Sequence, residues 1–389
     1  MKNIYNCHTH TFNGRYVPSV FLKEFLSGNT KALILGKLLK TSFLGINKLA
    51  VWVVGKTSYS TFAPFLKVGV MKTQDMVFED LKSNFPNDTR IVVLPLNFEY
   101  MGAGDVSISY QQQLDDLLEV RMRYPDQCLP FVFIDARMGT AEQNLAFIQR
   151  YLGQHKACVG IKLYPSLGYY PYDPRLYKVY EFAEQNQIPI ISHCSRGGIF
   201  YDPDTFPETI FHSTSFNPQL SNKVDRPGGN PAPTRQYDFK PAPAKEFKNN
   251  FIRPENYVDV LEKFPKLKLC LAHYGGDDDI LAFLKNGPSN TWYEQIKTLI
   301  ALYPNVHTDI SYSLHDPSIR EQIRKDFQDP TLRKRILFGT DYFMTLREPG
   351  VDEFHLYTDC LQTMQVGDFE VMANGNNREF LTTTFYTAP

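Results

Sequence analysis

Short runs of apolar, β-branched and aromatic residues recur along the chain, and each has a length that suits a buried strand. Eight such runs stand out, and seven polar or helix-like intervals separate them. The runs are NIYNCHTH (3–10), RIVVLPLNF (90–98), LPFVFIDAR (129–137), CVGIKLYP (158–165), IPIISHCS (188–195), LKLCLAHYGG (267–276), NVHTDISY (305–312) and RILFGTDYF (335–343). We therefore expect eight strands.

The intervals between these runs carry the periodicity of helices. Apolar positions recur every three or four residues in SYQQQLDDLLEVRMRYP, TAEQNLAFIQRYLGQH, DPRLYKVYEFAEQNQ and RPENYVDVLEKFP. Several of these segments begin with Ser, Thr, Asp or Pro and several end at Pro, as helix boundaries do. Alternating strands and helices favour parallel pairing through right-handed crossovers, and eight such units predict an α/β fold of the TIM-type (β/α)8 barrel class.

The chain is longer than such a barrel requires, because 389 residues exceed the typical ~250. Two segments hold most of the surplus: a helix-rich stretch after the first strand, residues 15–88, and a stretch rich in Pro, Asn and Gly after the fifth, residues 201–251. Both leave the carboxyl ends of strands, where barrel loops build active sites, so we expect them to cover a substrate. We interpret both as insertions in one domain that spans residues 1–389.

Ionisable residues stand at the ends of five of the predicted strands. They are His8 and His10 on the first, Lys162 on the fourth, His193 on the fifth, His273 on the sixth and Asp341 on the eighth. Because alternate residues of a strand share a face, His8 and His10 are expected to point together into the barrel mouth, and Cys7 to point outward to the helices.

Each of these residues taken singly has a structural explanation. His193 or His273 alone fits a hydrogen-bonded interior histidine, and Asp341 alone fits a helix cap. Imidazole nitrogen and carboxylate oxygen are, however, the ligands that divalent first-row metals prefer, and a catalytic site supplies about three or four of them. Residues from the first, fifth and eighth strands converge only if the sheet closes, so the barrel and the metal site support each other as predictions.

Composition and charge exclude several classes of function. The formal net charge of -1 gives no general field that would attract nucleic acid or anionic lipid. Six dispersed cysteines without a Cys-x-x-Cys pair, and an N-terminus without a signal-peptide pattern, lead us to expect reduced thiols and a cytoplasmic location. Residues 32–54 are apolar over a bilayer-spanning length, but three lysines interrupt them, which favours a packed amphipathic helix over a membrane span.

With these residues placed, the sequence resembles the amidohydrolase superfamily of metal-dependent barrel enzymes, and within it the amidohydrolase-related branch of lactonases, other hydrolases and non-oxidative decarboxylases. The resemblance covers nearly all of the chain. It is carried by HTH at the start, GIKLYPSLGYYPYDPRLYKVYEFAEQNQIPIISHCS, RPENYVDVLEKFPKLKLCLAHYGG, YPNVHTDISY, RILFGTDYF and the closing ANGNNREFL.

The resemblance implies a ligand set for one divalent metal, usually zinc. Its members are His8, His10, His193 and Asp341. In two-metal relatives a carboxylated lysine on the fourth strand bridges the ions, and Lys162 has that place. Lysine in this context also occurs in single-metal relatives, where it orients the substrate. We therefore expect one Zn²⁺, with a second ion only if Lys162 is carboxylated.

The resemblance also implies roles for residues around the metal. Activated water would attack a polarised carbonyl, Asp341 would pass the proton of the water to the leaving group, and His273 would stabilise the developing charge. Arg137, Arg196 and Tyr164 on the mouth side are candidate substrate contacts, although a surface ion pair would explain either arginine equally well.

We expect a hydrolase that cleaves an amide, lactone or ester of a small molecule. The alternative is a metal-dependent, non-oxidative decarboxylase of an aromatic or unsaturated carboxylic acid. A non-catalytic binding protein that contains a metal is disfavoured, because a structural zinc site is normally closed by four protein ligands. No nucleic-acid or membrane partner is expected, and the apolar stretch 20–70 would suit a homodimer interface or a lid equally.

Overall fold

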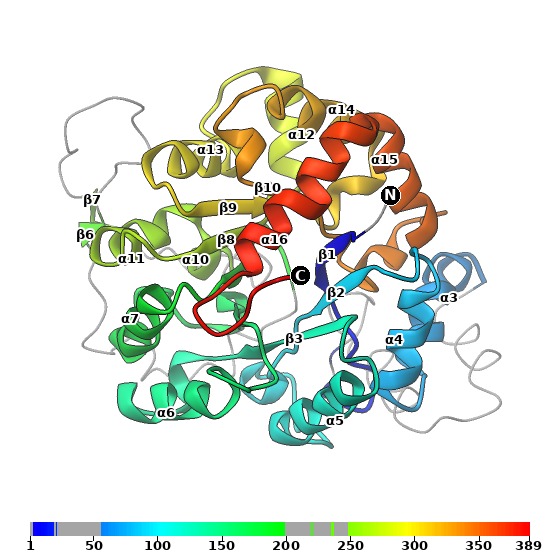
Figure 1. Ribbon diagram of the computed structural model, residues 1–389. Helices are drawn as coiled ribbons and strands as arrows, with labels where there is room; N and C mark the ends of the chain where they lie inside the picture. Colours follow the sequence, from blue (N-terminus) through cyan, green and yellow to red (C-terminus); the bar gives the residue numbers. More distant parts are fainter. Residues whose placement is uncertain (1–2, 19–20, 22–55, 199–218, 221–234, 237–247) are drawn as a thin grey trace.

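In the computed structural model, eight parallel strands form a barrel surrounded by helices (Figure 1). The structure describes residues 3–18, 21, 56–198, 219–220, 235–236 and 248–389. The barrel strands are β1 (Tyr5–Thr9), β2 (Arg90–Val93), β3 (Cys128–Phe133), β4 (Gly160–Leu163), β5 (Ile190–Ser195), β8 (Leu269–Gly275), β9 (Val306–Asp309) and β10 (Ile336–Leu337). Each lies within one of the eight runs expected from the sequence, except that β3 begins one residue before its run, and this confirms the TIM-type barrel.

The strands are neighbours in the order β1-β2-β3-β4-β5-β8-β9-β10. The barrel is closed between β1 and the segment that follows β10. There the Asp341 N–H donates to the His8 carbonyl over 2.8 Å, and the His10 N–H donates to the Tyr342 carbonyl over 2.6 Å. A single parallel bridge links Thr9 to Tyr342. This seam brings the two histidines of β1 beside Asp341, more than three hundred residues later in the chain.

Helices cover the outside of the barrel and one of its ends (Figure 1). They are α3 (Lys56–Gly69), α4 (Gln74–Lys82), α5 (Tyr110–Arg123), α6 (Ala141–Tyr151), α7 (Tyr177–Gln185), α10 (Asn249–Ile252), α11 (Val258–Lys263), α12 (Asp277–Asn286), α13 (Trp292–Leu302), α14 (Pro317–Asp326), α15 (Glu353–Glu370) and α16 (Asn377–Leu381). Ser109 and Thr140, which begin two of the expected helices, cap α5 and α6 by accepting a backbone N–H at the side-chain oxygen.

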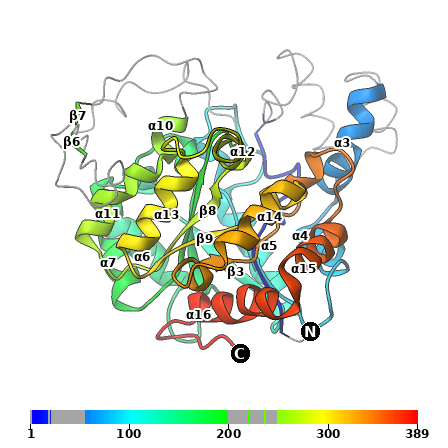
Figure 2. The same cartoon turned by 90° about the horizontal axis from the view of Figure 1, so that it is seen from above.

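The interior of the barrel is filled by apolar side chains. This interior cluster contains Tyr5, Cys7, Val92, Leu94, Leu129, Phe131, Val159, Ile191, Cys270, Ala272 and Leu337, together with Phe380 and Leu381 of α16 and Ala388. Figure 2 shows α16 and both ends of the chain together at one end of the barrel. The polar residues of the strands are therefore left at the opposite, carboxyl-terminal end.

Cys7 corrects one expectation from the sequence. Its side chain is fully buried and belongs to the interior cluster, so it does not face the helices. The pairing of β1 with β2 shifts register between Asn6 and Thr9. Strict alternation of faces, on which the expectation rested, therefore ends before the end of the strand.

Gly160 makes room for an aromatic ring inside the barrel. A Cβ atom on Gly160 would lie 2.4 Å from the ring of Phe131. Because a packed interior cannot absorb such an overlap without shifting a strand or a ring, we expect Gly160→Ala to lower the free energy of unfolding by about 1–3 kcal/mol. Urea denaturation measures this. Gly367→Ala, at a position with open space around it, is the control, and equal stabilities of the two variants would contradict the expected overlap.

Parts of both predicted insertions lie outside the described residues. The first contributes α3 and α4, and the second contributes the antiparallel pair β6 (Gln219–Leu220) and β7 (Arg235–Gln236). Residues 32–54 and most of 201–251 are not described, so the lid, the homodimer interface and the single-domain division stay predictions. Among the helices of the described ranges, none has the length and apolar character needed to cross a membrane.

Candidate active site

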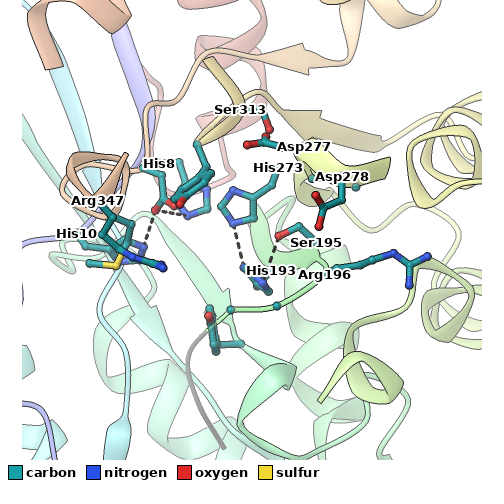
Figure 3. A pocket seen from close by; sticks show the side chains of 18 of the residues that line it. His8, His10, His193, Ser195, Arg196, His273, Asp277, Asp278, Ser313 and Arg347 are labelled. Atoms are coloured by element: carbon teal, nitrogen blue, oxygen red, sulfur yellow. Dashed lines mark hydrogen bonds and ion pairs between the residues drawn. The ribbon is translucent and has the colours of Figure 1, made fainter. Parts of the chain in front are cut away.

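A cavity of about 500 Å³ lies at the carboxyl-terminal end of the barrel strands (Figure 3). Seven of the residues singled out in the sequence line it: His8, His10, Tyr164, His193, Arg196, His273 and Asp341. Lys162 is fully buried beside this group, with its Nζ atom 3.3 Å from Nε2 of His8. The fold therefore gathers most of the predicted site in one place.

Three potential metal ligands meet across the seam of the barrel. Oδ1 of Asp341 lies 3.1 Å from Nε2 of His10 and 3.7 Å from Nε2 of His8. One ligand atom from each of the three residues lies within 4.8 Å of the others, and all three side chains are buried. We refer to His8, His10 and Asp341 as the ligand triad.

Hydrogen bonds on the far side of each imidazole determine where its proton lies. Nδ1 of His10 is 2.7 Å from the Leu94 carbonyl oxygen, and Nδ1 of His8 is 2.9 Å from a carboxylate oxygen of Asp309. Because both oxygens only accept hydrogen bonds, each Nδ1 carries a proton, and in the neutral form of each ring this leaves the lone pair on Nε2. Burial, followed by the charge of Lys162, also lowers the pKa of His8 to about 3, so this ring is neutral at pH 7.

The triad thus directs the Nε2 atoms of two histidines and a carboxylate oxygen toward one another. Oδ1 of Asp341 is buried and accepts no hydrogen bond of good geometry from the described part of the chain. Burial alone would raise the pKa of Asp341, but His10, His8 and His273 outweigh it and keep this pKa below its ordinary value. Two imidazoles in their neutral form and one carboxylate make a ligand set that fits a divalent first-row ion.

Asp309, at the end of β9, is a residue of the site that sequence reasoning missed. Its carboxylate accepts hydrogen bonds from Nδ1 of His8 at 2.9 Å, from the backbone N–H of His273 at 3.0 Å, and from the hydroxyl of Ser311. Burial opposes the ionised form, but His8 and His273 outweigh it and hold the pKa of Asp309 well below its usual range. Its place at the end of an apolar strand, like that of Asp341, was the signal that could have identified it.

His193 lies apart from the triad and contacts His273. Nδ1 of His193 is 2.9 Å from Nε2 of His273, and Nδ1 of His273 is 2.9 Å from the hydroxyl oxygen of Ser311. The Tyr164 ring packs against His193 with their centroids 4.6 Å apart. Three of the four ligands implied by the resemblance, His8, His10 and Asp341, therefore lie together. The fourth, His193, is hydrogen-bonded to His273.

Lys162 lies deep in the barrel among these groups. Burial lowers its pKa to about 8, although the nearby carboxylates of Asp341 and Asp309 act in the opposite direction. His8, His273 and Asp309 form a second set of potential ligands within 4.8 Å of one another. Lys162 therefore stands next to both sets, which is the location that a lysine bridging two ions or orienting a substrate would need.

The arginines near the carboxyl-terminal end of the barrel differ in their partners and in whether they line the cavity. Arg137 pairs with Asp135 at 2.6 Å and is absent from the described wall of the cavity. Arg196 lines the cavity and pairs with Asp279 at 2.6 Å. Arg347, which the sequence reasoning missed, lies in the short helix η11 (Met344–Arg347) and lines the cavity. Figure 3 shows it beside His10, across the cavity from Arg196.

Two of the site residues singled out in the sequence have a strained backbone. His273 has φ 68° and Asp341 has φ 62°, both in the left-handed region that non-glycine residues rarely adopt. Such conformations cost on the order of 1–3 kcal/mol each and cluster at functional sites. The backbone conformations of His273 and Asp341 therefore lower the stability of the fold, and both side chains line the cavity.

Comparison with known proteins identifies the fold and the family. A family model described as Amidohydrolase matches residues 89–371, which is most of the chain. Among curated proteins, none matches the chain significantly.

Several solved structures share the fold over nearly the whole chain. An uncharacterised TIM-barrel protein from Bordetella bronchiseptica has 17% identity and a TM-score of 0.53, covering 97% of this chain and 98% of that one. A probable 2-pyrone-4,6-dicarboxylic acid hydrolase from Acinetobacter baumannii has 11% identity and a TM-score of 0.53, with 97% and 99% covered. A 5-carboxyvanillate decarboxylase from Novosphingobium aromaticivorans with bound manganese has 10% identity and a TM-score of 0.53, with 98% and 97% covered. At these identities the likeness shows the fold alone.

Proposed function

Because the chain belongs to the amidohydrolase family, whose members are metal-dependent enzymes, we propose that it is a metal-dependent hydrolase that cleaves the amide, lactone or ester bond of a small molecule. The observation that carries the proposal is the convergence of the ligand triad on the cavity, where two imidazole nitrogens and a carboxylate oxygen face one another. Under this proposal, the polar residues around the triad would provide the remaining groups that such a reaction needs.

We propose that His8, His10 and Asp341 hold the ion, with Zn²⁺ as the candidate and His193 as a fourth ligand. His193 would exchange its hydrogen bond with His273 for this role. When bound, a divalent cation supplies a Lewis acid that polarises a carbonyl group and lowers the pKa of water. Lys162, which contacts His8, would hydrogen-bond the substrate or the ligand shell, or bridge a second ion if carboxylated.

The other residues have roles in binding and proton transfer under this proposal. Asp341 would accept the proton of the attacking water at the carboxylate oxygen that does not hold the ion, and return it to the leaving group. His273, held in place by Ser311, would stabilise charge that develops on the carbonyl oxygen. Tyr164, Arg196 and Arg347 line the cavity and would contact the substrate.

Incubation of the metal-loaded protein with a panel of lactones, amides, esters and aromatic acids tests the proposed function. We expect acid release, followed with a pH indicator, without release of carbon dioxide. Asp341→Asn should lower the rate by a factor of at least about 100, because it removes the proton acceptor. Carbon dioxide release from the aromatic acids would instead support the decarboxylase, and no turnover across the panel would support a binding protein.

A further inference from the structure

Three buried polar side chains tie the barrel seam together directly behind the ligand triad. Asn6 lies on β1, Thr340 precedes Asp341, and Glu353 is the first residue of α15; each is at most 2% exposed. Nδ2 of Asn6 donates to Oγ1 of Thr340 over 2.8 Å, and the Thr340 N–H donates to Oδ1 of Asn6 over 3.2 Å. The Thr340 hydroxyl then donates to a carboxyl oxygen of Glu353. We call these three residues the seam clamp.

The seam needs such a connection because its backbone ladder is short. β10 has two residues, and a single bridge joins β1 to the segment after it. His8 and His10 lie on one side of the seam and Asp341 lies on the other, so the distance across the seam sets the spacing of the ligand atoms. Metal sites require their ligands to be held within about 0.5 Å of the productive geometry.

The clamp connects to the triad through the backbone. The His8 N–H lies 3.4 Å from Oδ1 of Asn6, and Thr340 is the chain neighbour of Asp341. Burial raises the pKa of Glu353 to about 8, although its hydrogen bond with Thr340 acts in the opposite direction, so this carboxyl adds little charge beside the ion at pH 7. The three side chains are thus suited to fix the two ligand-bearing segments without competing for the ion.

We propose that Asn6, Thr340 and Glu353 are positioning residues that set the spacing between the histidines of β1 and Asp341, and thereby the affinity of the site for a divalent ion. The inference rests on the proposed function, because it takes the ligand triad to be the metal site. It goes further by assigning a role to three residues that lie behind the cavity wall.

The same seam offers a matched control at its other end. Nδ2 of Asn377 donates to the carbonyl oxygens of Tyr5 at 2.7 Å and Phe338 at 3.0 Å, and Asn377 is fully buried. This residue joins the same two segments, but at the end of β1 away from the triad. A variant there weakens the seam without acting next to His8 or Asp341.

The test compares Zn²⁺ dissociation constants, measured by competition with a chromophoric chelator, in the full-length protein and its variants. Thr340→Val keeps the shape of the side chain and removes its hydroxyl, and we expect Zn²⁺ binding to weaken about 10- to 100-fold. Thr340→Ser restores the hydroxyl and should bring the constant back to within about threefold of the parent. Asn377→Leu should lower the unfolding temperature and leave the dissociation constant near that of the parent.

Two results would overturn the clamp: a parent-like dissociation constant for Thr340→Val, or an equal loss of affinity in Asn377→Leu. If Thr340→Val does not fold, Glu353→Leu removes only the outer member of the clamp and is measured in the same way, with the same loss of affinity expected. If the parent itself binds no Zn²⁺ or other divalent ion, the proposed function fails together with the clamp. Tight Zn²⁺ binding by both the parent and the clamp variants would contradict the positioning role of the seam clamp and leave the proposed function intact.

Discussion

Replacing His10 with alanine is expected to abolish stoichiometric metal binding and to lower hydrolytic activity by on the order of 1000-fold or more. Nε2 of His10 is one of the three converging donors and lies 3.1 Å from Asp341. The other hydrogen bond of the ring goes to the Leu94 carbonyl. Loss of that bond costs about 1–3 kcal/mol, which leaves a barrel of this size folded.

Elemental analysis of the purified variant, together with its activity on the substrate panel, measures this result. His355→Ala is the matched control, because His355 lies on the exposed side of α15 paired with Asp352, and is not among the residues that line the cavity. We expect the control to keep the metal content and the activity of the parent. A His10→Ala protein with full metal content would contradict the triad.

Asp309→Ala is expected to lower both stability and metal affinity. Asp309 is a fully buried charge that accepts hydrogen bonds from His8, His273 and Ser311. Removing one partner of such a buried network costs about 3–5 kcal/mol in the free energy of unfolding. His8 also loses the group that fixes its proton on Nδ1, so we expect metal binding to weaken about 10- to 100-fold.

A variant of a second buried aspartate distinguishes the loss of stability from the loss of metal affinity. Asp326 accepts hydrogen bonds from Tyr293 and Lys297 between α13 and α14, and it is not among the residues that line the cavity. Asp326→Ala should therefore lose stability by a similar mechanism and keep the metal affinity of the parent. Chemical denaturation and chelator competition on both variants measure the two quantities. Unchanged metal affinity in Asp309→Ala would show that His8 does not need this carboxylate.

The strands and the core of the site could be predicted because their signals are local and repeated. Each barrel strand coincides with an apolar run that is recognisable from the sequence alone. His8, His10 and Asp341 could be grouped because parallel strands in a closed barrel carry all their carboxyl ends to one mouth. Closure of the barrel, and not proximity in the chain, brings these residues together.

Residues whose geometry depends on a tertiary partner could not be predicted. Cys7 lies in the barrel interior next to a register shift in β1, and the Asp135 carboxylate two residues away pairs with Arg137. His193 contacts His273 because β5 and β8 are adjacent, which the order of the strands alone does not specify at the level of atoms. The roles of Asn6 and Thr340 likewise depend on a side-chain pair that spans 334 positions.

Anomalous diffraction from crystals of the full-length protein grown with Zn²⁺ tests the central claim most directly. The account predicts a strong peak within about 2.0–2.2 Å of Nε2 of His8, Nε2 of His10 and a carboxylate oxygen of Asp341. A peak at another place in the molecule, or none in the cavity of an otherwise well-ordered crystal, would contradict the ligand triad and with it the proposed function.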